Sequence, residues 1–138
     1  MTSHPDPYTT TGTELTDVEC WEILRGSTVG RLAVSILNKP DIFPVNYGVD
    51  GETIVVNTAP GTKLAAAVSD EMVAFEVDRI DPERRRGVSV VVRGPAVEVE
   101  TLEELMHVED LVEPWDPSDK RHFLRITPHE LSGRRIGS

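Results

Sequence analysis

The stretch PVNYGVDGETIVVNTAPGTKL, residues 44–64, decides the fold of this chain. Two runs rich in β-branched residues flank Asp50 and Gly51, a pair that supplies the positive φ angles of a two-residue hairpin turn. After the second run, the segment PGTK (60–63) is typical of a glycine-led helix start. The stretch therefore predicts a strand, a tight turn, a second strand and the beginning of a helix.

The same pattern of short β-type runs and turn residues continues on both sides of this stretch. Short β-type runs separated by turn residues predict seven strands: VGRLAVSIL, IFPVNYGV, TIVVNT, MVAFEVD, VSVVVRGPAVEVE, HFLRIT and ELSGRRI. The segment NKPD (38–41) is predicted as the first turn, and RIDPERRRG (79–87) as a loop. Seven short strands with three short helices predict a mainly β fold, an antiparallel β-barrel decorated by a few short helices.

Two of the helices are predicted from their first residues. Thr16 and Glu19 fit a capping box, in which each side chain bonds the backbone of the other, and this predicts a helix over 17–25. The segment TLEE (101–104) repeats the pattern and predicts a helix to about Val112. The remaining helix is predicted over 62–68, in an alanine-rich segment.

Length and composition indicate one globular domain. The chain has 138 residues, and residues 1–14 are polar and aperiodic, so we expect a disordered arm followed by a single domain over 15–138. A net charge of -10 opposes binding to nucleic acid and to anionic membranes. The single cysteine, Cys20, allows no internal disulfide and is expected to be a small core residue. These features predict a cytoplasmic protein.

Several chemistries lack support in the sequence. The four histidines show no metal-ligand spacing, so no metal site is predicted. The nucleophile-elbow, Walker and dinucleotide-binding patterns are missing. The arginine run at 84–86 is interpreted as an exposed turn, with contact to an anionic ligand tail or a partner subunit as the alternative. Arg125, Arg134 and Arg135 are expected to be charges at the surface or at the rim of a dimer.

The strand-to-helix transition is a candidate anion site. The first N–H groups of a helix have no internal partners and its dipole is positive there, so a phosphate is stabilised at the start of a helix that directly follows a strand. Thr62 would add a hydroxyl donor, Lys63 a positive charge, and Thr58 a second hydroxyl from the end of the strand. We expect a phosphate group at this position.

The order of these segments resembles the pyridoxamine 5'-phosphate oxidase-like, FMN-binding split β-barrels. The resemblance is carried by GRLAV, PVNY, the Asp-Gly turn, GTKL, VAFEVD, VRG, the PW loop and the final RI strands. It covers nearly the whole chain and is most marked for the small flavin and deazaflavin reductases of the actinobacterial type. It implies a homodimer with a cofactor site between two subunits.

The resemblance also implies which residues hold the cofactor. Thr58, Thr62 and Lys63 would bind the phosphate, and Val45 and Asn46 would neighbour the flavin ring. Ser89 would approach the ring from the partner subunit, and Trp115 would cover it. For Asn46 a backbone bond at a strand irregularity remains an alternative, as does a plug over the core for Trp115.

Two positions depart from the family pattern. Relatives often carry an arginine where this chain has Asn57, and a tryptophan where it has Val88. The resemblance nevertheless implies an FMN-dependent oxidoreductase acting on a small molecule by hydride or electron transfer, with a deazaflavin as the alternative cofactor. The alternatives are a dimer that binds a flavin or deazaflavin for storage or sensing without catalysis, and a member whose cofactor site has decayed.

Overall fold

A computed structural model describes residues 13–58, 64–113 and 122–137. Its helices are α1 (Asp17–Arg25), α2 (Leu64–Val68) and α3 (Leu102–Glu109). Its strands are β1 (Val29–Ile36), β2 (Lys39–Asp50), β3 (Thr53–Thr58), β4 (Met72–Asp81), β5 (Arg86–Glu98), β6 (His122–Ile126) and β7 (Glu130–Ile136). The described part of the chain thus has the seven strands and three helices that the sequence predicts.

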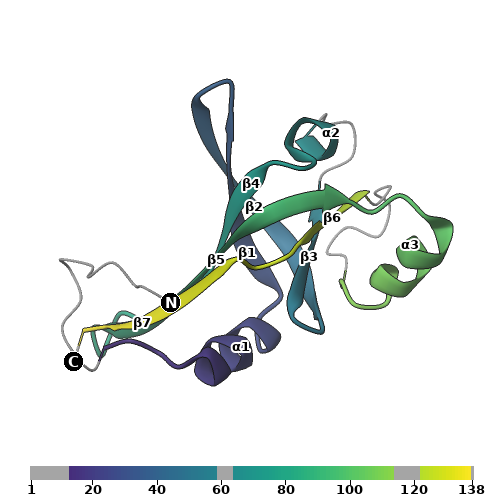
Figure 1. Cartoon of the computed structure of the whole chain (residues 1–138). Coiled ribbons are helices and arrows are strands. Elements are labelled where there is room, and N and C mark those ends of the chain that lie inside the picture. Colours follow the sequence, from purple (N-terminus) through teal and green to yellow (C-terminus); the bar gives the residue numbers. More distant parts are fainter. Residues whose placement is uncertain (1–12, 59–63, 114–121, 138) are drawn as a thin grey trace.

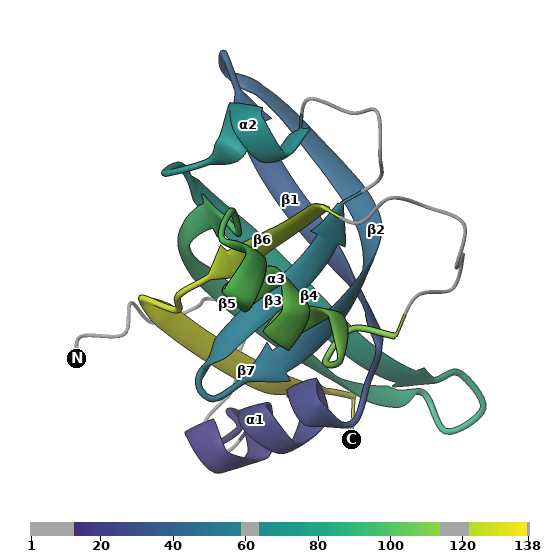
Figure 2. The same cartoon turned by 90° about the vertical axis from the view of Figure 1, so that its right-hand side faces the viewer.

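The strands form an antiparallel barrel (Figures 1 and 2). Their order is β4-β1-β2-β3-β6-β5, and the pairing of β4 with β5 closes the ring. The long strand β5 pairs first with β7 and then, at its end, with β6. One strand therefore serves two successive neighbours, and β7 extends the sheet beyond the closed ring. The predicted split β-barrel is confirmed.

The barrel interior is built by simple alternation along the strands. In β4 the inward residues Val73, Phe75 and Val77 are buried, while the residues between them are half-buried. Burying each such side chain contributes about 1.5–3 kcal/mol. A second, smaller cluster lies outside the ring, between α3 and the outer face of β3 and β6; its buried members are Val55, Val99, Val108, Val112 and Phe123. The outer face of the barrel is thus covered in one sector by α3 (Figure 2).

Helix α1 closes one end of the barrel, opposite α2 (Figure 2). Thr16 and Glu19 form both bonds of the predicted capping box, and the helix ends at Arg25 as expected. Cys20 is buried as a core residue, and burial raises the pKa of its thiol. The helix approaches β7 closely, because a Cβ atom at Gly133 would lie 2.6 Å from the Cys20 Sγ atom.

The hairpin turns differ from the predictions. The turn between β1 and β2 is made by Leu37 and Asn38, whose φ angles are 51° and 63°, and strand β2 already begins at Lys39. The predicted NKPD turn (38–41) is therefore wrong by two residues. The next turn is Gly51-Glu52, and in it Gly51 alone has a positive φ, 60°. The prediction of positive φ at both Asp50 and Gly51 is wrong, because Asp50 pairs with Thr53 as the last residue of β2.

Two further boundaries need correction. Strands β4 and β5 pair as far as Asp81 and Arg86, so the predicted 79–87 loop shrinks to residues 82–85. Helix α3 ends at Glu109 and not at Val112. The reason is a tightened turn, in which the Leu111 and Val112 N–H groups both donate to the Val108 carbonyl. This turn directs Val112 into the cluster beneath the helix.

Candidate functional site

The predicted ring-side strand places its residues on opposite faces. In β2, Val45 and Tyr47 point into the barrel and are 7% and 2% exposed, while Asn46 between them lies on the outer face. Val45 was predicted as a neighbour of the flavin ring, but its side chain belongs to the core. Asn46 is therefore the residue of this pair whose side chain lies on the outer face.

Tyr47 is a structural residue. Its hydroxyl donates a 2.5 Å hydrogen bond to the Leu24 carbonyl at the end of α1, and its ring packs edge-on against Phe75 at 4.8 Å. Burial raises the pKa of Tyr47 to about 12. Strand alternation thus turns Tyr47 inward, and its hydroxyl is not available as a proton donor on the outer face.

Asn57 lies beside Asn46 on the outer face. The two asparagines are directly paired across β2 and β3. Within the described residues, Asn57 Oδ1 is the one buried side-chain polar atom without a hydrogen-bond partner. Leaving a buried acceptor unsatisfied costs about 1–3 kcal/mol, so this atom needs a donor. A ribityl hydroxyl or a ring N–H of a flavin offers such a donor, and the residues present fit the group in this respect.

Thr58 ends β3 with its side chain on the inner face. It is 1% exposed, and its hydroxyl donates to the His122 carbonyl on β6 at 3.0 Å. Its proton is therefore used within the barrel, although its lone pairs remain. Thr62, Lys63 and Trp115, which were predicted to hold the phosphate and cover the ring, lie outside the described residues. Helix α2 begins at Leu64, the residue after Lys63 in the sequence.

Ser89 shares the outer face with Asn46 but lies far around the barrel. Its hydroxyl donates to Glu76 at 3.2 Å, and Glu76 is also paired with Arg31 at 3.1 Å. Burial, followed by neighbouring Asp78, raises the pKa of Glu76. Asn46 on β2 and Ser89 on β5 are separated by β1 and β4, which corresponds to about 14 Å along the sheet. One chain cannot bring both side chains to the same ligand atom.

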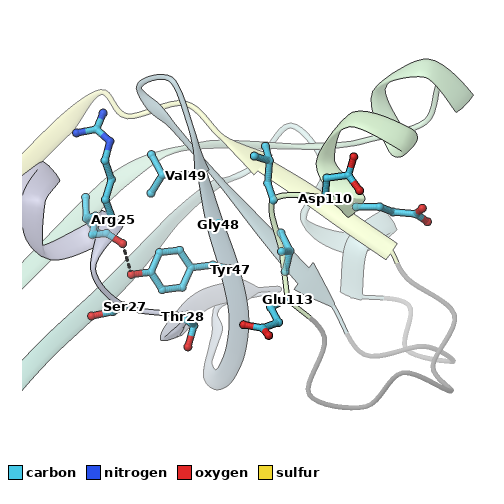
Figure 3. Close-up of a pocket in the computed structure, with 12 residues that line it drawn as sticks. Arg25, Ser27, Thr28, Tyr47, Gly48, Val49, Asp110 and Glu113 are labelled. Atoms are coloured by element: carbon cyan, nitrogen blue, oxygen red, sulfur yellow. Dashed lines mark hydrogen bonds between the residues drawn. The ribbon is translucent and has the colours of Figure 1, made fainter.

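A pocket of about 640 Å³ opens elsewhere, between the end of α1 and the chain that follows α3 (Figure 3). Figure 3 shows Tyr47 on the side formed by β2, and Asp110 and Glu113 on the side formed by the segment after α3. Gly48 lines the pocket, and the segment after α3 approaches β2 closely at this point, because a Cβ atom at Gly48 would clash with the Leu111 carbonyl oxygen. None of Asn46, Thr58 and Ser89 lines this pocket, and its acidic side chains repel a phosphate.

Arg125 is a residue whose role the sequence did not indicate. It was expected at the surface, but its side chain is 21% exposed and lies between α3 and the β2–β3 hairpin. It donates to Asp50 at 2.9 Å, to Thr53 at 2.7 Å and to Glu104 at 3.1 Å. Alternation along β6 places Arg125 on the same face as Phe123, beneath α3. That face was readable from the sequence, but the helix that covers it was not.

No group of three His, Cys, Asp or Glu side chains in residues 13–58, 64–113 and 122–137 is arranged to hold a metal ion. In the same residues, each helix is too short or too polar to cross a membrane.

The fold and sequence identify the family. The chain folds as a split barrel, and the model of the family described as pyridoxamine 5'-phosphate oxidase matches residues 16–135. The chain therefore belongs to this family.

Its relatives include proteins described as binding FAD. The FAD-binding protein from Mycobacterium smegmatis is 35% identical, with a TM-score of 0.79, over 91% of this chain and 99% of that chain. An FAD-binding protein from Mesorhizobium loti is 27% identical, with a TM-score of 0.72, over 90% and 97% of the two chains. The uncharacterized protein Rv0080 of Mycobacterium tuberculosis is 33% identical over 128 residues, which cover 89% of this chain and 84% of that protein.

Proposed function

We propose that this chain binds a flavin and uses it to oxidise or reduce a small molecule. The observation that carries the proposal is the 35% identity over 91% of the chain to the Mycobacterium smegmatis protein described as FAD-binding. The orphaned acceptor of Asn57 supports it, because it lies on the face where the family resemblance puts the ring. When bound, the flavin supplies the hydride or electron transfer, and the protein supplies position and hydrogen bonds.

The chain's own residues would divide the work of binding. Asn57 would accept a hydrogen bond from a ribityl hydroxyl or a ring N–H, and Asn46 beside it would bond the ring edge. Lys63 and Thr62 would hold the phosphate at the start of the helix. Ser89 would orient the ring from the other subunit, with its hydroxyl positioned by Glu76.

A homodimer is part of the proposal. Asn46 and Ser89 lie on the same outer face but about 14 Å apart along the sheet, at the usual strand spacing. A two-fold arrangement of two outer faces would set Asn46 of one subunit near Ser89 of the other. The site would then be incomplete in a monomer.

The flavin itself has three candidate forms. FMN is the form that the family resemblance implies, whereas the relatives at 35% and 27% identity are described as FAD-binding. A deazaflavin is the third. Titration of the purified full chain with each cofactor, followed by fluorescence and native mass spectrometry, distinguishes them. We expect micromolar binding of FAD or FMN, one per subunit of a dimer; absence of binding by all three would overturn the proposal and favour a decayed site.

Lys63→Ala tests the phosphate anchor. Its loss removes a charge-assisted hydrogen bond, so flavin binding should weaken by about ten- to a hundred-fold. Lys39→Ala is the matched control, because Lys39 is exposed at the start of β2. Equal affinities of the two folded variants would exclude Lys63 as the anchor.

Asn57→Leu separates binding from stability. It replaces an unsatisfied buried acceptor by an apolar side chain of similar size, so the apo-protein should be as stable as the wild type or more stable. Flavin affinity should nevertheless fall about ten-fold. A loss of stability with unchanged flavin affinity would show that Asn57 serves the fold alone.

A flavin-binding protein without catalysis is the second candidate. It is favoured because Tyr47 is not available as a proton donor on the outer face: its hydroxyl donates to the Leu24 carbonyl, and burial raises its pKa to about 12. Reduction of the bound flavin by NADH or NADPH, followed by stopped-flow reoxidation with small acceptors, tests this. Reoxidation no faster than that of free flavin would support storage or sensing over catalysis.

A further inference from the structure

We propose that a second pocket, at the end of the barrel closed by α1, binds the phosphate group of a small phosphorylated molecule. The pocket has a volume of about 460 Å³ and is formed by the ends of β4, β5 and β7. Arg79, Arg86 and Arg135 line it, with Asp81 as its single carboxylate. None of the residues assigned to the flavin lines it.

The strand register brings two of these arginines together. Val88 on β5 is paired with Arg79 on β4 and with Arg135 on β7, so the three form one row across the sheet. Because successive residues of a strand face opposite ways, this row lies on the face opposite Ser89. The short side chain of Val88 leaves room between the two guanidinium groups.

Arg79 is held in place by the end of α1. Its Nη2 atom lies 3.4 Å from the Ile23 carbonyl oxygen. A Cβ atom at Gly26 would be 2.2 Å from the same nitrogen, so the guanidinium sits directly against the helix end. Arg79 is therefore positioned before any ligand arrives.

Arg135 is held from the first turn of the same helix. It donates to Glu19 at 2.6 Å, and Glu19 also accepts from the Thr16 N–H group at 3.0 Å. The bond from the Thr16 backbone, together with Arg135, lowers the pKa of Glu19, so this carboxylate stays ionised at neutral pH. A guanidinium has five N–H donors, which leaves Arg135 free to bond an anion as well.

Arg86 supplies charge that the described residues do not neutralise. In residues 13–58, 64–113 and 122–137, Arg86 takes part in no ion pair, and the nearby Asp81 is paired with Arg84 at 2.8 Å. The lining thus carries three guanidinium groups and one committed carboxylate, in a chain whose net charge is -10. An anion is the ligand whose charge complements this lining.

The shape of the pocket narrows the class of anion. Guanidinium groups bind phosphate oxygens in paired, planar hydrogen bonds, and three of them can surround one dianion. Val88, Ile80 and Ile136 provide apolar surface beside the arginines. The volume lies in the range of about 300–1,000 Å³ that holds small ligands. A phosphate monoester with a small apolar body fits both features.

The test uses the full chain with phenyl phosphate as the probe and benzyl alcohol as the uncharged comparison. Calorimetry measures affinity, and ¹⁵N spectra report which amides respond. We expect phenyl phosphate to bind and to shift Gly87 and Gly137, binding to weaken as salt rises, and benzyl alcohol to have no effect. Absence of binding, or shifts confined to other parts of the protein, would overturn the proposal.

Three variants sharpen the test. Arg86→Gln should weaken phenyl phosphate binding about ten-fold or more, because a charge-assisted hydrogen bond is lost. Arg93→Gln is the matched control, since Arg93 is an exposed arginine on the outer face of the same strand. Val88→Trp should block the pocket without changing its charge. Equal affinity in Arg86→Gln and Arg93→Gln, or undiminished binding to Val88→Trp, would refute the site.

A final titration separates this pocket from the flavin site. Phenyl phosphate is added to the protein saturated with FAD or, where no flavin binds, to the protein alone. Unchanged affinity in the presence of FAD supports an independent site. Competition between the two ligands would assign the arginines to the tail of the flavin and would overturn the proposal.

Discussion

The helices α1 and α3 begin alike but hold different positions. Each has a threonine at its N-cap, followed three residues later by a glutamate. In α1 both bonds of the capping box form, and Cys20, Ile23 and Leu24 are buried in the barrel core. In α3 the threonine accepts its bond, but Glu104 turns away to Arg125, and Val108 is the buried residue of the helix.

The difference shows that a capping signal locates a helix start and not the role of the helix. Helix α1 is part of the barrel, because its apolar face closes one end of the core. Helix α3 lies outside the ring and is held by five buried residues together with the hydrogen bonds of Arg125. We therefore expect α3 to detach at a lower free energy than α1.

Leu24→Ala should produce the largest effect. Leu24 is fully buried in the barrel core, and truncating such a residue costs about 2–5 kcal/mol. Thermal or urea unfolding measures the loss. Leu102→Ala in α3 is the control, because Leu102 is 72% exposed and its truncation should change stability by less than about 0.5 kcal/mol. Similar losses in both variants would contradict the distinction between the helices.

Arg125→Gln should loosen α3 while leaving α1 in place. It removes hydrogen bonds to Asp50 and Glu104 at a half-buried site, at a cost of about 1–3 kcal/mol. Hydrogen exchange should show faster exchange of the α3 amides with little change in α1. Equal acceleration in both helices would mean that Arg125 supports the whole barrel.

The same contacts give α3 a dependence on pH. Burial raises the pKa of Asp50, but hydrogen bonds from Arg125 and then His107 outweigh it and hold this pKa below its usual range. A carboxyl with a lowered pKa contributes stability above its unfolded value, about 3.9, and loses it as pH falls through the folded value. Protection of α3 should therefore fall below about pH 4 in the wild type. This acid-dependent loss should be smaller in Arg125→Gln, and an unchanged profile would contradict the assignment.

Removing the two N-cap threonines should give the smallest effects, and the two costs compare directly how much each cap stabilises the protein. Thr16→Ala removes the hydroxyl that accepts from the Glu19 N–H and donates to the Glu19 carboxylate, while the bond from the residue 16 N–H to Glu19 remains; it should cost about 1 kcal/mol, as N-cap removal usually does. Thr101→Ala breaks a single bond and should cost about 0.5 kcal/mol, at the lower end of the usual range. Paired urea unfolding curves measure both. A larger cost for Thr101→Ala would reverse the ranking.

The sequence predicted what local pattern and alternation determine. The antiparallel barrel and the start and end of α1 follow from side-chain periodicity and capping residues. Cys20 is buried, as expected of a small core residue.

The rest depended on contacts between segments far apart in the chain. Strand alternation put Arg125 on the outer face, but only the packing of α3 made it half-buried. The end of α3 depended on where Val112 could be buried. The Thr58 hydroxyl donates its hydrogen bond to a carbonyl 64 residues away in the chain. For the candidate site, sequence named Asn46 and Ser89 but not the unsatisfied oxygen of Asn57, which becomes visible when β2 and β3 are paired.

Because Cys20 is buried against Gly133, the reactivity of its thiol reports how often α1 separates from β7. This thiol is the single cysteine of the chain and is 1% exposed, so a thiol reagent can reach it only when α1 moves off β7. The rate of labelling under native conditions therefore measures the free energy of that opening, without any added probe. Ligands that bind at either end of the barrel can then be ranked by how much they slow the reaction.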